Sequence, residues 1–104
     1  KADAMAVELL RDSDGSIQLI GQLDFDNVIE CRRRGEQLLD DSASPVRISL
    51  ARLERPSSIV VSLLLGWQRH ALRQQKPLLF QSPPGALRQI ITVCGLDELF
   101  AFDG

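Results

Sequence analysis

The clearest hydrophobic pattern lies within residues 46–67, where the spacing of apolar positions changes along the chain. Its first part has the two-residue period of a half-buried strand, with apolar side chains at Val46, Ile48 and Leu50. Its second part stays apolar over too many consecutive positions to form another strand. The pattern therefore predicts a strand over 46–50 that leads through a loop into a helix over 58–74.

Strand and helix patterns alternate along the rest of the chain. The other predicted strands cover 5–10, 16–20 and 78–81, and the other predicted helices cover 28–39 and 86–94. The segment 96–100 is predicted to be either a last short strand or a turn. The first two strands are separated by residues with hairpin-turn chemistry. This order predicts an α/β fold in which helices pack on a mixed sheet of four or five strands. We expect a single domain over 1–104.

The helix predicted over 58–74 is more apolar than the cover of one sheet face requires. A helical projection places one apolar stripe at Val60, Leu64, Trp67 and Ala71, a shoulder at Val61, Leu65 and Leu72, and the opposite side at Ser62, Gly66, Arg69 and Arg73. The apolar arc spans roughly 200°, whereas about 100° covers a sheet face. The excess either packs on a neighbouring helix or forms a partner surface near the helix start. Trp67 should be buried or lie between helices.

The same helix is preceded by a proline and two serines, Pro56, Ser57 and Ser58. Proline suits the start of a helix because its missing N–H has no partner there, and a serine side chain can accept a bond from a free backbone N–H. One interpretation is that Ser57 or Ser58 only caps the helix. The other is a surface site, either a phosphoryl acceptor or a docking point, beside the positive end of the helix dipole.

Composition and charge exclude several classes of partner. The 104 residues are 44% hydrophobic and 25% charged, with a formal net charge of −2. A nucleic-acid-binding domain would be strongly basic, so we expect no nucleic-acid partner. The longest apolar run, 59–65, is far too short to span a bilayer, so we expect no direct membrane insertion.

The residues that could carry chemistry are few and isolated. Cys31 and Cys94 lack metal-ligand spacing and are predicted to be buried free thiols of a reducing compartment, which indicates a cytoplasmic location. His70 is the only histidine, and we expect its side chain to be solvated. The arginines at 32–34 are typical of a solvated helix face. With no glycine-rich phosphate-binding motif either, we expect a binding or regulatory module without catalysis, cofactor or metal.

Five segments, taken in order, resemble the STAS domain, the SpoIIAA-like fold of anti-sigma factor antagonists and of sulfate-transporter tails. They are GQLDFDN at 21–27, VRISLARL at 46–53, PSS at 56–58 with LLLGWQRHA at 63–71, LLFQSPPGALRQI at 78–90, and CGLDELF at 94–100. Within this family the chain is most similar to the small STAS subunit of the Mla (toluene-tolerance) ABC system. The LDFDN segment, the tryptophan of the second helix and the GL..LF ending carry that similarity.

This resemblance implies a non-catalytic cytoplasmic accessory subunit that binds and supports the ATPase of a phospholipid-trafficking ABC transporter. Such a transporter maintains outer-membrane lipid asymmetry, and the subunit would be peripheral to the inner membrane through its complex. The alternative is an anti-sigma factor antagonist that a partner kinase phosphorylates on serine. The sequence leaves homodimer formation open.

The wide apolar arc beside the Pro-Ser-Ser turn places the predicted partner-binding site around the start of the second helix, a segment through which the resemblance also implies docking. Its predicted residues are Arg55, Pro56, Ser57, Ser58, Val61 and Ser62, with the Pro83–Pro84 turn as a rim. Family members often carry an aspartate before the serine or threonine, and Pro56 stands at that position here. The missing acid speaks against phosphorylation of Ser57 or Ser58 and leaves the docking role intact. We expect glutamate at positions 58 and 61 to weaken the complex and leave the fold intact.

Overall fold

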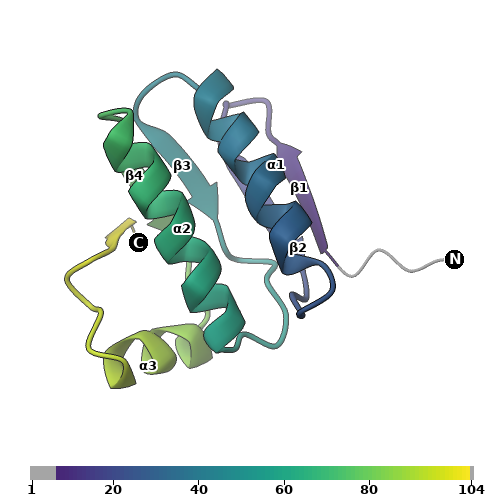
Figure 1. Cartoon of the computed structure of the whole chain (residues 1–104), viewed down its shortest axis with the longest axis vertical. Helices are drawn as coiled ribbons and strands as arrows, with labels where there is room; N and C mark the ends of the chain where they lie inside the picture. Colours follow the sequence, from purple (N-terminus) through teal and green to yellow (C-terminus); the bar gives the residue numbers. More distant parts are fainter. Residues whose placement is uncertain (1–6, 104) are drawn as a thin grey trace, which may run out of the picture.

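The computed structural model describes residues 7–103 as a five-stranded sheet whose strands lie in the order β1-β2-β3-β4-β5, with three helices (Figure 1). The elements are β1 (Val7–Arg11), β2 (Ile17–Gly21), α1 (Val28–Asp41), β3 (Val46–Ser49), α2 (Ser58–Arg73), β4 (Leu78–Gln81), α3 (Gly85–Val93) and β5 (Ala101–Asp103). The α/β fold with a mixed five-stranded sheet is therefore confirmed. The start of the first predicted strand, at 5–6, lies outside the described residues.

The sheet combines one antiparallel hairpin with a parallel series. β1 pairs antiparallel with β2, and each later pair of neighbours, from β2–β3 to β4–β5, is parallel. Helices α1 and α2 lie side by side on one face of the sheet, and α3 lies near the start of α2 (Figure 1). Because β2, β3 and β4 run in the same direction, the segments that follow them all leave from one end of the sheet, which we call the carboxyl end.

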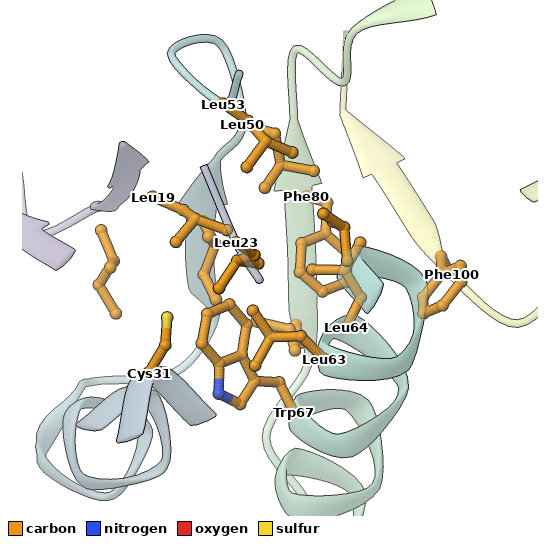
Figure 2. Close-up of a cluster of buried hydrophobic side chains, with 14 of the residues drawn as sticks. Leu19, Leu23, Cys31, Leu50, Leu53, Leu63, Leu64, Trp67, Phe80 and Phe100 are labelled. Atoms are coloured by element: carbon orange, nitrogen blue, oxygen red, sulfur yellow. The ribbon is translucent and has the colours of Figure 1, made fainter. Parts of the chain in front are cut away.

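The contact between α1 and α2 is organised by one aromatic ring. Trp67 is fully buried, which confirms the sequence prediction, and its Nε1 donates a hydrogen bond to the backbone oxygen of Arg32 at 3.0 Å (Figure 2). Gly35 makes room for the indole, because a Cβ at this position would lie 2.3 Å from the ring. Gly66 is also buried against Arg32, so the helical projection was wrong to place it on the outer side.

Two element boundaries differ from the sequence prediction for local reasons. α1 continues to Asp41, and the Lys76 ammonium group donates to the backbone oxygens of Leu39, Asp40 and Ser42 near its end. The last strand begins at Ala101, and the segment 96–100, for which the sequence allows a strand or a turn, forms a turn in which the Leu99 N–H donates to the Leu96 oxygen. Phe100, at the end of this turn, packs edge-on against Phe80, with ring centroids 5.7 Å apart.

Three isolated side chains are also clarified by the fold. Cys31 is buried in the core as expected, and burial raises the pKa of its thiol to about 11. Cys94 is exposed, so the prediction of a second buried thiol is wrong, because this residue lies just beyond the last buried turn of α3. The expectation of a solvated His70 is also wrong, since its side chain is only 18% exposed and its Nε2 lies 2.8 Å from an Asp40 carboxylate oxygen.

Candidate protein-binding site at the carboxyl end of the sheet

Three loops gather at the carboxyl end of the sheet. The segment 22–27 connects β2 to α1, the segment 50–57 connects β3 to α2, and the segment 82–84 connects β4 to α3. Figure 1 shows all three at the same end of the molecule, next to the first turns of α1, α2 and α3. The residues predicted from sequence to bind a partner lie in the second and third of these loops and in the first turns of α2.

The loop before α2 is held firmly on the end of β2. The Gly21 N–H donates to the Arg52 oxygen at 3.1 Å, and the Glu54 N–H donates to the Gly21 oxygen at 2.7 Å. Two leucines of the loop, Leu50 and Leu53, are buried in the core (Figure 2). A loop fixed at both backbone and side-chain level presents its exposed residues without an ordering cost at binding.

The start of α2 has the capping geometry that the serines predicted. Ser57 is the N-cap, and its side-chain oxygen accepts a hydrogen bond from the Ile59 N–H at 3.3 Å. Ser58 is the first residue of the helix, and its side chain is exposed. Ser62 is exposed one turn further on, so the two hydroxyls lie on the same side of α2. Ser57 therefore has the structural role, and Ser58 is the serine open to a partner.

Backbone strain accompanies this arrangement. Arg55 has a φ of 46° and Ser82 has a φ of 53°, and both lie in loops at the carboxyl end of the sheet. This left-handed region is sparsely populated by residues other than glycine and asparagine, and such outliers persist where the surrounding contacts fix them. Arg55, in the loop before α2, directly precedes Pro56. The loop geometry is thus imposed by its anchors and not by local preference.

The third loop forms a rim beside α3. Pro84 is the N-cap of α3, and its backbone oxygen accepts from the N–H groups of Leu87 and Arg88. Pro83 and Pro84 are both partly exposed. Two consecutive prolines keep this loop rigid, because the ring of each one fixes its φ.

The structure removes Val61 from the set of surface residues. Its side chain is only 4% exposed and belongs to the hydrophobic core, so it is not available to a partner in the folded domain. The expectation that glutamate at position 61 would leave the fold intact is therefore wrong, because a charge would enter the core. Within the shoulder of α2 only Leu72, which is 64% exposed, remains a large open side chain.

Two residues at the carboxyl end of the sheet were missed by the sequence reasoning. Phe25 is 83% exposed and Ile29 is 75% exposed, although both are large and apolar. Phe25 lies in the LDFDN segment, which the hydrophobic pattern marked only as a transition. An aromatic residue between two aspartates, in a segment that belongs to no strand, was the signal that could have identified it.

The chemistry of this end is that of recognition. It offers hydroxyls at Ser58 and Ser62, a guanidinium at Arg55 and apolar surface at Phe25 and Ile29. Within residues 7–103, no group of three or more histidine, cysteine or acidic side chains could hold a metal ion. In the same part of the chain, none of the helices has both the length and the apolar character that crossing a membrane requires.

The sequence matches a known family over nearly its whole length. A family model described as "Mlab, STAS domain" matches residues 8–101. The chain belongs to this STAS domain family. The matched range includes the three loops at the carboxyl end of the sheet and all three helices of the STAS domain. No curated protein is detectably similar to the sequence.

Solved structures share the fold of this STAS domain. An anti-sigma factor antagonist from Mycobacterium paratuberculosis superposes with a TM-score of 0.76 at 21% identity, over 97% of this chain and 89% of that one. The unphosphorylated form of the anti-sigma factor antagonist SpoIIAA gives 0.70 at 20% identity, over 95% and 89% of the two chains. A chain from the stressosome, described as a signal integration and transduction hub, gives 0.60 at 21% identity, over 91% and 85%.

Proposed function

We propose that this STAS domain is a non-catalytic accessory subunit that binds the ATPase of a phospholipid-trafficking ABC transporter and supports its activity. The single observation that carries the proposal is the match of residues 8–101 to the MlaB-type STAS family. STAS domains typically act as binding modules, which agrees with the recognition chemistry at the carboxyl end of the sheet. In this role the domain works in the cytoplasm and reaches the inner membrane only through its complex.

The docking surface in this proposal is the carboxyl end of the sheet. Arg55, Ser58 and Ser62 are exposed there, and the Pro83–Pro84 turn follows β4 at the same end of the sheet. Pro56 and Ser57 shape the surface by starting α2 and capping it, so they contribute through geometry more than through contact. A partner that binds this surface meets hydrogen-bond donors and acceptors that are already held in place.

A second function is favoured by the position of Ser58. Its hydroxyl is exposed at the N-terminus of α2, where a phosphate would be stabilised by free N–H groups and the helix dipole. Phosphorylation adds about −1.5 to −2 charge at neutral pH and could release a partner. The domain would then be an anti-sigma factor antagonist that a kinase controls. Pro56 stands before the two serines where family members often carry an aspartate, and the missing acid weighs against that role.

The proposal is tested by measuring the affinity of the domain for the purified ATPase subunit of the phospholipid-trafficking transporter from the same organism. We expect Ser58→Glu combined with Ser62→Glu to raise the Kd by about ten-fold or more, because two new charges would be desolvated at the interface. Both side chains are exposed, so the free variant should unfold at the same denaturant concentration as the parent.

A matched control places the same two substitutions at the opposite end of the sheet. Ser13 and Ser44 are exposed in the turn before β2 and in the loop before β3, so Ser13→Glu with Ser44→Glu adds equal charge away from the docking surface. This control should bind like the parent. Equal weakening by both variants would attribute the effect to net charge, and full binding by the first variant would place the docking surface elsewhere.

A further inference from the structure

We infer that Phe25 and Ile29 form an apolar anchor that inserts into a hydrophobic socket with a basic rim on the ATPase subunit. The inference rests on the proposed function and deepens it, because it names the part of the docking surface that holds the partner. The starting observation is that the Phe25 side chain is 83% exposed and the Ile29 side chain is 75% exposed, although both are large and apolar. Such exposed apolar residues mark interaction surfaces when they gather at one place.

The two side chains lie on the same side of the chain. The Val28 N–H donates to the Asp24 oxygen at 3.1 Å, a contact across four residues, so the backbone already coils before α1 begins. Residues four apart in such a coil face the same direction. Phe25 and Ile29 therefore present one continuous apolar surface, while Val28 between them packs against the core.

The turn that carries Phe25 is held by its own side chains. One Asp24 carboxylate oxygen accepts from the N–H groups of Asp26 at 2.8 Å and Asn27 at 3.0 Å. In return the Asn27 side-chain oxygen accepts from the Asp24 N–H at 2.9 Å, and the Asn27 amide donates to the Gln22 oxygen at 3.1 Å. The backbone that carries Phe25 is therefore held in place, so only the side-chain torsions of the ring remain to be ordered on binding.

The anchor is continuous with the proposed docking surface. Gly21, which ends β2 and precedes this turn, shares two backbone hydrogen bonds with Arg52 and Glu54 of the loop that leads to α2. The turn and the start of α2 therefore lie side by side at the carboxyl end of the sheet, as Figure 1 shows. One partner can cover both, because the backbone holds them in a fixed relation.

The charge around the anchor indicates the character of the socket. Asp26 is exposed beside Phe25, and Glu30 is exposed beside Ile29, where it also pairs with Arg33 at 2.6 Å. Because Glu30 is paired with Arg33, Asp26 is the carboxylate at the edge of the apolar pair that a lysine or arginine at the rim of a hydrophobic pocket would complement.

The test measures the affinity of the intact domain for the purified ATPase subunit with both anchor residues truncated. We expect Phe25→Ala combined with Ile29→Ala to raise the Kd by about 30-fold, the loss typical of removing a buried anchor. Asp26→Lys should weaken binding too, through the basic rim. The control is Leu72→Ala with Val93→Ala, which removes side chains that are 64% and 87% exposed elsewhere and should leave the Kd unchanged.

The possible outcomes separate this inference from the proposed function. If the parent binds the ATPase and the anchor variant binds equally well, the anchor is wrong and the proposed function stands. If the parent does not bind the ATPase, both are wrong. If sedimentation shows a parent dimer that the anchor variant abolishes, the patch is a self-interface and the inference is overturned. A photoreactive phenylalanine analogue at position 25 provides a second readout, since it should crosslink to the ATPase in the purified complex.

Discussion

At the scale of single residues, the clearest feature is the packing of the large Trp67 side chain against Gly35, which has no side chain. The indole fills the contact between α1 and α2 and is locked by its hydrogen bond to the Arg32 backbone. Because the ring has nowhere to move, a methyl group at position 35 must displace it or separate the helices. The same reasoning explains why Val61 cannot serve as a surface residue, since its neighbours close around it.

We predict that Gly35→Ala lowers the free energy of unfolding by about 1–3 kcal/mol, the usual cost of overpacking a core. Urea denaturation followed by tryptophan fluorescence measures this change and also reports on the indole. The matched control is Gly85→Ala, where a Cβ would meet nothing within 4 Å, and which should be neutral or slightly stabilising. An unchanged denaturation midpoint for Gly35→Ala would contradict the packing argument.

At the scale of elements, the ends of α1 and α2 away from the docking surface are joined by a polar cluster. Asp40 accepts hydrogen bonds from Gln74 and from His70, and these contacts lower the pKa of the Asp40 carboxyl. Nearby, Lys76 caps the end of α1 by donating to three backbone oxygens. These bonds fix the relation of the two helices at one end, while Trp67 fixes it in the middle.

The lowered pKa of Asp40 predicts a specific pH dependence of stability. A carboxyl whose pKa is depressed in the folded state stabilises the fold above its unfolded pKa, and this contribution is lost as the pH falls through the folded value. We therefore expect the parent to lose stability below about pH 4, the ordinary range of aspartate, more steeply than Asp40→Asn. Thermal unfolding between pH 7 and pH 3 tests this, and parallel curves for the two proteins would contradict it.

At the scale of the whole molecule, parallel strands and rigid helix contacts bring three loops to one end of the sheet. Phe25, Arg55, Ser58 and the Pro83–Pro84 turn come from distant parts of the sequence, and the topology of β2, β3 and β4 places them together. The turn at 22–27 is held by its own hydrogen bonds and the loop before α2 by its bonds to Gly21, so the proposed docking surface is formed before a partner binds. A preformed surface suits a constitutive subunit of a transporter complex.

A surface that is already formed predicts that the domain binds its partner without covalent modification. Mass spectrometry of the protein from its native host should find Ser57 and Ser58 unphosphorylated. Ser57 uses its side-chain oxygen as the helix cap, and none of the three residues directly before Ser58 is acidic. Stoichiometric phosphate on Ser58 would instead support the anti-sigma factor antagonist, in which a kinase controls partner exchange.

The sequence by itself determined the elements whose pattern is local. The alternation at Val46 and Ile48, the stripe that contains Trp67 and the capping serine before α2 each follow from neighbouring residues, and the structure confirms them. The α/β class followed from their order. The sequence left 96–100 open between a short strand and a turn, and the backbone bonds of the structure close a turn there, with β5 beginning at Ala101.

Only the tertiary structure decided which apolar and polar side chains face outward. A helical projection cannot tell whether a shoulder packs inside or stays open, so Val61, which it placed on the shoulder, was wrongly expected at the partner surface. Gly66 was placed on the wrong side. Pairings such as His70 with Asp40 join residues 30 positions apart and carry no sequence signal. The exposure of Phe25 and Ile29 depends on where α1 lies against α2, because burial is a property of the assembled layers and not of any single segment.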